Sequence, residues 1–182
     1  MFYSCDDSGW GHLVGPCVIA VASEDAPNIL YIGDIQIEYF QDQLFWEKKY
    51  LERAWEIVQE AVETLRIGTG DTIYCCSGYV VSYAVAQLKR NGFKVIVESH
   101  VERRAHEVAE NAFLERLKNI GAPVEKLLLE NSDRNRARNF YTLLNWVKED
   151  EAARMKWAKH GWTYFHPERR RAKFLGNSSF KG

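Results

Sequence analysis

The chain has 182 residues, a hydrophobic fraction of 46%, six tryptophans and a formal net charge of −1. This length and apolar content predict one folded domain with a small appendage and argue against a disordered chain. No apolar run reaches the length of a membrane span and the N-terminus lacks a basic-then-apolar signal, so we expect an intracellular protein, cytoplasmic or nuclear (nucleoid).

The charge is divided unevenly along the chain. Residues 1–130 hold 12 Lys+Arg against 20 Asp+Glu, a balance of −8, whereas residues 131–182 hold 12 against 5, a balance of +7. This division predicts an acidic body with a basic arm or face. The four cysteines lie in or beside apolar segments without metal-knuckle spacing, so we expect reduced thiols at Cys5, Cys17, Cys75 and Cys76.

The first half of the chain predicts three strands and a helix. Apolar or alternating runs at 2–5, 17–22 and 30–40 predict three antiparallel strands joined by short connections. Apolar residues at helical spacing predict a helix over 44–66, which the glycines of segment 68–70 end.

The second half alternates strands and helices. We expect strands at 72–76 and 94–99 and helices at 79–90 and 101–120. The order βββ-α-β-α-β-α predicts an α/β fold with parallel crossovers onto a mixed sheet. We assign residues 1–122 to this core and residues 123–182 to a basic, aromatic, helical C-terminal extension.

This order and three short motifs resemble the ribonuclease H superfamily. The run TIYCCSGYVVSYAV is similar to the fourth strand and following turn of ribonuclease HI, where a metal-binding aspartate precedes the serine; here Cys76 precedes Ser77. The resemblance implies a ribonuclease H-like fold and a nucleic-acid partner, such as an RNA/DNA hybrid, a duplex or a junction. Nucleases of this fold use two divalent metals held by carboxylates, which implies Mg or Mn if the site is active.

The start of the chain resembles two families at once. The stretch YSCDDSGWG is similar to the first strand of ribonuclease HI, which implies that Asp6 is the first metal ligand. The longer stretch CDDSGWGHLVGP is similar to the start of ribonuclease HII, which implies that Asp6 and Asp7 are both catalytic, with Trp10 in place of an arginine. The alternative is a turn whose polar side chains bond to their own backbone.

Two helices carry the other resemblances. The segment YLERAWEIVQEA is similar to the family's first helix and implies a metal-bridging role for Glu52, against the alternative of a solvated glutamate. The segment ESHVERRAHEVAENA is similar to the family's last core helix, with His106 in place of a metal-binding aspartate and His100 as the loop histidine that assists turnover. The alternative is a helix histidine beside Glu102 and Glu110.

Cys76 and His106 thus occupy two of four places that carry carboxylates in the family. Because such a loss removes charge compensation at a two-metal centre, we favour a protein that binds nucleic acid with two-metal hybrid cleavage impaired or lost. The alternative is an active metal-dependent endonuclease, of the ribonuclease H or Holliday-junction-resolvase type, with a rearranged carboxylate site. Glu107 and Glu110, one helical turn apart, would then join Asp6 and Asp7 as metal ligands. A small-molecule enzyme on an unrelated α/β fold has no supporting motif.

The C-terminal extension combines cations with aromatic residues. Cations bind phosphates and aromatic faces stack on bases, which favours contact with nucleic acid. In the alternative, the aromatic rings pack on the core and the cations form its solvated face. The candidate nucleic-acid contacts are Arg134, Arg136, Arg138, Trp157, Trp162, Arg169, Arg170 and Arg171.

Overall fold

A mixed five-stranded sheet forms the centre of the computed structural model, which describes residues 1–99, 103–128 and 132–166. The strand order is β3-β2-β1-β4-β5. The strands β1, β2 and β3 are antiparallel neighbours, and β4 and β5 continue the sheet in parallel to β1. Their bounds are Phe2–Ser8 (β1), Cys17–Ser23 (β2), Leu30–Ile35 (β3), Thr72–Cys76 (β4) and Lys94–Glu98 (β5).

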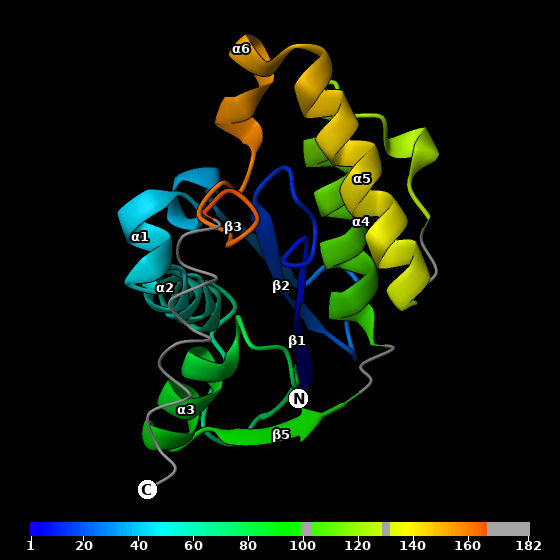
Figure 1. Ribbon diagram of the computed structural model, residues 1–182. Helices are drawn as coiled ribbons and strands as arrows, with labels where there is room; N and C mark the ends of the chain where they lie inside the picture. The colour runs from blue at the N-terminus through cyan, green and yellow to red at the C-terminus, as the bar shows by residue number, and fades with distance from the viewer. Residues whose placement is uncertain (100–102, 129–131, 167–182) are drawn as a thin grey trace, which may run out of the picture.

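Helices cover both faces of the sheet (Figure 1). The helices α2 (Lys49–Thr64) and α3 (Ser82–Arg90) lie on one side, and α4 (Arg104–Asn119) lies on the other with α5 (Asp133–Glu149) beside it. The predicted order of strands and helices, and the predicted mixed sheet, are confirmed. Shorter elements complete the description: η1 (Ile37–Phe40), α1 (Asp42–Trp46), η2 (Val124–Lys126), α6 (Glu151–Arg154) and η3 (Met155–Trp157).

The strand β2 is buried on both faces, which explains its continuous apolar run. Ile19 and Val21 belong to the core cluster that contains Ile57 of α2. Ala20 and Ala22 instead pack against Ala105 and Ala109 of α4. These small side chains let α4 approach the strands that carry the candidate site.

Two predicted boundaries are wrong. The third strand ends at Ile35 and continues into η1, and the predicted helix 44–66 is two helices, separated at Lys48, whose φ is 59°. The cause is aromatic packing: Phe40 and Phe45 both lie on Tyr50, at centroid distances of 5.7 and 5.5 Å. The chain changes direction at Lys48, and this change brings the rings of Phe40 and Phe45 onto Tyr50 of α2.

The C-terminal extension packs directly against the core. Leu143 and Val147 of α5 share a buried cluster with Phe113 and Leu117 of α4. Further along, the backbone N–H of Lys159 donates to the carbonyl of Leu13 (2.8 Å), in the loop between β1 and β2. The described part of the extension therefore contributes to the same hydrophobic interior as α4. None of the described helices has the length and apolar character needed to cross a membrane.

Candidate functional site

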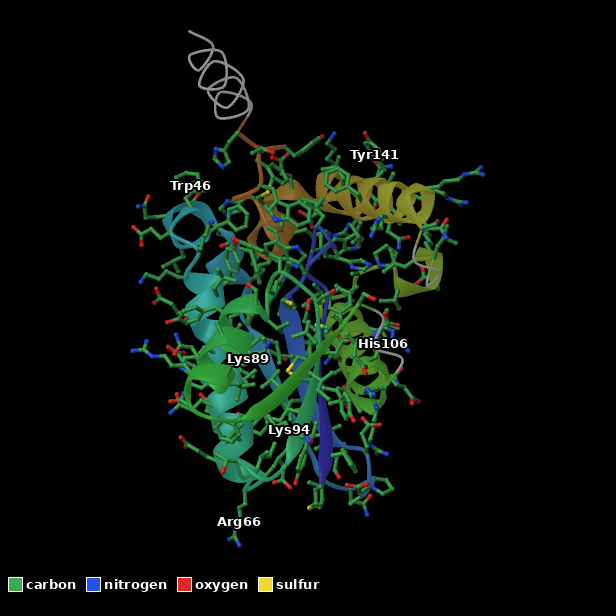
Figure 2. The ribbon with its side chains drawn as sticks, turned by 90° about the horizontal axis from the view of Figure 1, so that it is seen from below. Trp46, Arg66, Lys89, Lys94, His106 and Tyr141 are labelled. Carbon is green, nitrogen blue, oxygen red and sulfur yellow. The ribbon has the colours of Figure 1, made fainter. Side chains whose placement is uncertain are left out.

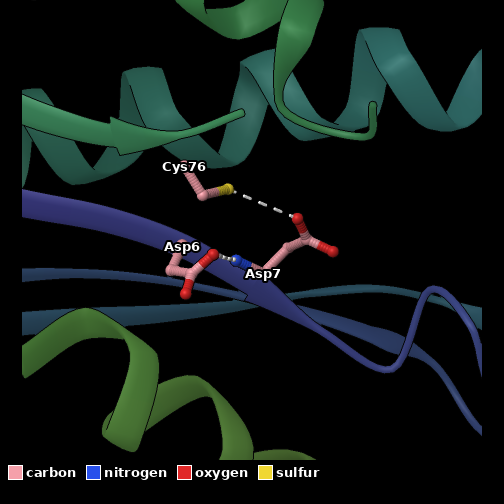
Figure 3. Close-up of side chains that lie close together, drawn as sticks. All are labelled: Asp6, Asp7 and Cys76. Atoms are coloured by element: carbon pink, nitrogen blue, oxygen red, sulfur yellow. Dashed lines mark hydrogen bonds between the residues drawn. The ribbon is translucent and has the colours of Figure 1, made fainter. Parts of the chain in front are cut away.

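The ends of β1 and β4 bring two of the sequence motifs together. The two strands are parallel neighbours with Cys5 opposite Cys75, so the residues that follow also lie side by side. Ligand atoms of Asp6, Asp7 and Cys76 lie within 4.8 Å of one another (Figure 3). We call these three residues the β1–β4 cluster.

The third motif reaches this cluster from α4. Oδ2 of the buried Asp6 lies 2.8 Å from Nδ1 of His106, and Oδ1 accepts the backbone N–H of Asp7 (2.8 Å). The outer nitrogen of His106, Nε2, lies 3.7 Å from Oε1 of Glu110. The His106 side chain, labelled in Figure 2, is 44% exposed, so part of the imidazole that contacts Asp6 faces solvent. Three segments that the family resemblance singles out separately thus form one site.

Asp7 is held between two thiols. Its carboxylate oxygens lie 3.6 Å from Sγ of Cys76 and 3.7 Å from Sγ of Cys17. Burial, and then the charge of Asp6, raise the pKa of Asp7 to about 6, although the thiols and Lys159 oppose this. Burial and the two nearby carboxylates also hold the pKa of the Cys76 thiol far above its ordinary value. Without a bound cation, Cys76 is therefore a neutral donor.

A buried lysine from the extension supports this region. The ammonium of Lys159 donates to the carbonyl of Gly9 and lies 4.6 Å from the centroid of the Phe40 ring. Burial lowers the pKa of Lys159 to about 8, although the charges of Cys17 and Asp7 oppose the shift. Sequence reasoning missed Lys159, because a lysine in a basic segment is expected at the surface.

The rings of Trp10, Tyr50 and Tyr79 form an aromatic cluster beside the β1–β4 cluster. Trp10 follows Asp7 in the loop after β1, and Tyr79 follows Cys76 in the loop after β4. The ring centroid of Trp10 lies 5.1 Å from that of Tyr50 and 6.0 Å from that of Tyr79. Tyr79 is 46% exposed and the ammonium of Lys48 lies 5.8 Å from its ring centroid. The signal available in the sequence was that Trp10 and Tyr79 lie within two of the motifs, three residues after Asp7 and Cys76 respectively.

The remaining candidate carboxylates lie elsewhere. Glu52 is on the exposed side of α2, where both of its oxygens accept hydrogen bonds from Lys49 at 2.9 Å. Glu107 is exposed on α4. Within the described part of the chain, neither joins the β1–β4 cluster. His100 lies outside the described residues.

The predicted nucleic-acid contacts of the extension divide into three groups. Arg134, Arg136 and Arg138 are exposed on α5. Trp157 and Trp162 are half-buried and pack against the cluster that joins α4 and α5, so packing is the role that the structure gives them. Arg169, Arg170 and Arg171 lie outside the described residues.

The donor atoms of the site do not fit a pair of magnesium ions. Magnesium takes hard oxygen ligands, and here only Asp6 and Asp7 offer carboxylates within the β1–β4 cluster. Asp6 also shares one of its oxygens with His106. The other donors at the site, the thiol of Cys76 and the imidazole of His106, both favour softer metals.

Comparison with known proteins identifies the fold. No protein-family model matches the sequence, and no curated protein matches it. A chain in a structure of the PCNA:RNase HII complex from Archaeoglobus fulgidus is similar, with a TM-score of 0.55 and 15% sequence identity. The match covers 82% of this chain and 89% of the other. At this identity the likeness establishes a ribonuclease H-like fold.

Proposed function

We propose that this protein binds nucleic acid through a ribonuclease H-like fold and has lost two-metal cleavage of RNA/DNA hybrids. The observation that carries the proposal is the composition of the assembled site: Asp6 is paired with His106, and Cys76 stands beside Asp7. Two-metal hydrolysis needs several carboxylates to hold both ions and offset their charge. The expected ligand is an RNA/DNA hybrid or another structured duplex.

The aromatic cluster beside the site supports the binding role. Tyr79 presents an exposed ring that can stack on a base or a sugar, and Lys48 places a cation close to it for phosphate contact. His106 partly offsets the negative charge of Asp6 when it is protonated. The exposed arginines of α5 offer further phosphate contacts.

Binding can be tested without any cleavage chemistry. We expect the full chain to bind a fluorescent RNA/DNA hybrid, by anisotropy in a chelating buffer, with an affinity that falls as salt rises. Tyr79→Ala should raise Kd roughly five- to hundredfold, because stacking on one base is worth about 1–3 kcal/mol. Tyr83→Ala, which removes another exposed tyrosine, is the matched control and should leave Kd nearly unchanged. Absence of binding at low salt would overturn the proposal, and equal effects of the two variants would remove Tyr79 from it.

One observation favours a second function, an active divalent-metal-dependent nuclease with a rearranged carboxylate site. Glu110 lies next to His106, which itself contacts Asp6, so a third carboxylate is near the β1–β4 cluster. If these carboxylates hold metal together, the protein will cleave a hybrid or a four-way junction in Mg or Mn, and Asp6→Ala will abolish the cleavage.

A further inference from the structure

We propose that the β1–β4 cluster is a site for one soft divalent cation of the zinc class, held by Asp6, Asp7 and Cys76, in place of a magnesium pair. The inference uses the same site as the proposed function and deepens it by naming the cation, but it does not require nucleic-acid binding. The cluster offers a thiol beside two carboxylates, whereas magnesium prefers oxygen ligands alone.

The spacing of the donor atoms fits a zinc-like ion. Zinc bonds are about 2.3 Å to thiolate sulfur and about 2.1 Å to carboxylate oxygen, so a tetrahedral ion separates these two ligands by about 3.6 Å. Sγ of Cys76 and Oδ1 of Asp7 are 3.6 Å apart. All three donor atoms lie within 4.8 Å of one another, which places an oxygen of Asp6 beside the same position.

A glycine keeps the space beside these ligands open. A Cβ atom at Gly78 would lie 2.6 Å from Oδ1 of Asp7 and 3.2 Å from Sγ of Cys76, so any side chain there would displace both donors. Three protein ligands leave a fourth position for water, as in catalytic zinc sites. The glycine is thus an independent feature that preserves the geometry of the cluster.

His106 orients one of the ligands. Its Nδ1 lies 2.8 Å from Oδ2 of Asp6, and the backbone N–H of Asp7 donates to Oδ1, so both oxygens of this carboxylate are held in place. Hydrogen bonds to ligating carboxylates fix their orientation, and removing such a partner weakens metal affinity about 10–100-fold. His106 is therefore a positioning residue for this ion.

Binding forms a metal–sulfur bond and releases the Cys76 proton to solvent. The two carboxylates and the thiolate then carry three negative charges against the two positive charges of the ion. The buried cation of Lys159 also acts on Asp7 and offsets the remaining negative charge.

Cobalt(II) added to the chelator-stripped full chain tests the inference, because a cobalt–thiolate bond absorbs in the near ultraviolet. We expect this band to saturate at one ion per chain, to disappear on addition of zinc, and to persist in excess magnesium. Cys76→Ala should abolish it. Cys75→Ala, which removes the adjacent thiol, is the matched control and should retain it.

His106→Ala should keep the band but weaken cobalt binding about 10–100-fold. A wild-type chain without the band, a band that persists in Cys76→Ala, or displacement by magnesium would each overturn the inference. The nucleic-acid measurement is made in chelator, so its outcome is independent of this one. Failure of the metal site and failure of the proposed function are therefore distinguishable.

Discussion

Asp7 is a half-buried carboxylate that lies beside a second one, Asp6. Burial and the charge of Asp6 raise its pKa from an ordinary value of 3.8 to about 6. Between these values the native chain keeps a proton that the unfolded chain releases. The free energy of unfolding should therefore fall as pH rises from about 4 to about 6, by about 3 kcal/mol at most.

Asp7→Asn should remove most of this dependence, because the amide does not titrate. Urea unfolding of both proteins between pH 4 and 7, in chelator, measures the two slopes. If the variant keeps the same slope as the wild-type chain, another group causes the pH dependence and the raised pKa does not belong to Asp7.

At the scale of single residues, the sequence indicates a site residue when a motif fixes its place on an element. Asp6, Cys76 and His106 each lie in such a motif, and the fold brings all three together. Lys159 has no motif, and only the packing of the extension on the loop after β1 turns it inward. Glu52 lies in a motif too, but the buried side of α2 is formed by other residues, such as Ala54 and Ile57.

Close packing of α2 against β3 depends on one glycine. A Cβ at Gly33 would lie 2.4 Å from Cγ2 of Ile57, which is fully buried. Gly33→Ala should therefore lower the free energy of unfolding by about 1–3 kcal/mol, through overpacking of the core. Urea unfolding measures the change.

Gly70→Ala is the control for this prediction, because a Cβ at that position meets no atom within 4 Å. We expect its stability to stay within about 0.5 kcal/mol of the wild-type chain. Equal losses in both variants would show that the effect comes from chain flexibility and not from the contact between α2 and β3.

Helices and strands with continuous patterns were predictable, and their interruptions were not. The apolar run at 17–22 and the segment 72–76 match β2 and β4 closely. The break at Lys48 has no local signal, because it follows from packing Phe40 and Phe45 on Tyr50, residues that a helical pattern does not distinguish.

The molecule as a whole joins a ribonuclease H-like sheet to an extension that supplies part of its interior. Leu13 and Val14, in the loop after β1, are buried with residues of α4 and α5. The same loop connects Asp7 to the aromatic cluster. The charge asymmetry predicted a basic arm or face, but charge counts carry no information on the apolar residues through which the extension packs.

The central claim is that an assembled but altered site binds nucleic acid without two-metal cleavage. The most direct measurement is incubation of the full chain with an end-labelled RNA/DNA hybrid in Mg or Mn, beside Asp6→Ala and the double variant Cys76→Asp/His106→Asp. We expect the wild-type chain and Asp6→Ala to bind the hybrid and to leave it intact. The double variant restores two carboxylates, and we expect it to gain magnesium binding. Cleavage of the hybrid by the wild-type chain that Asp6→Ala abolishes would contradict the account.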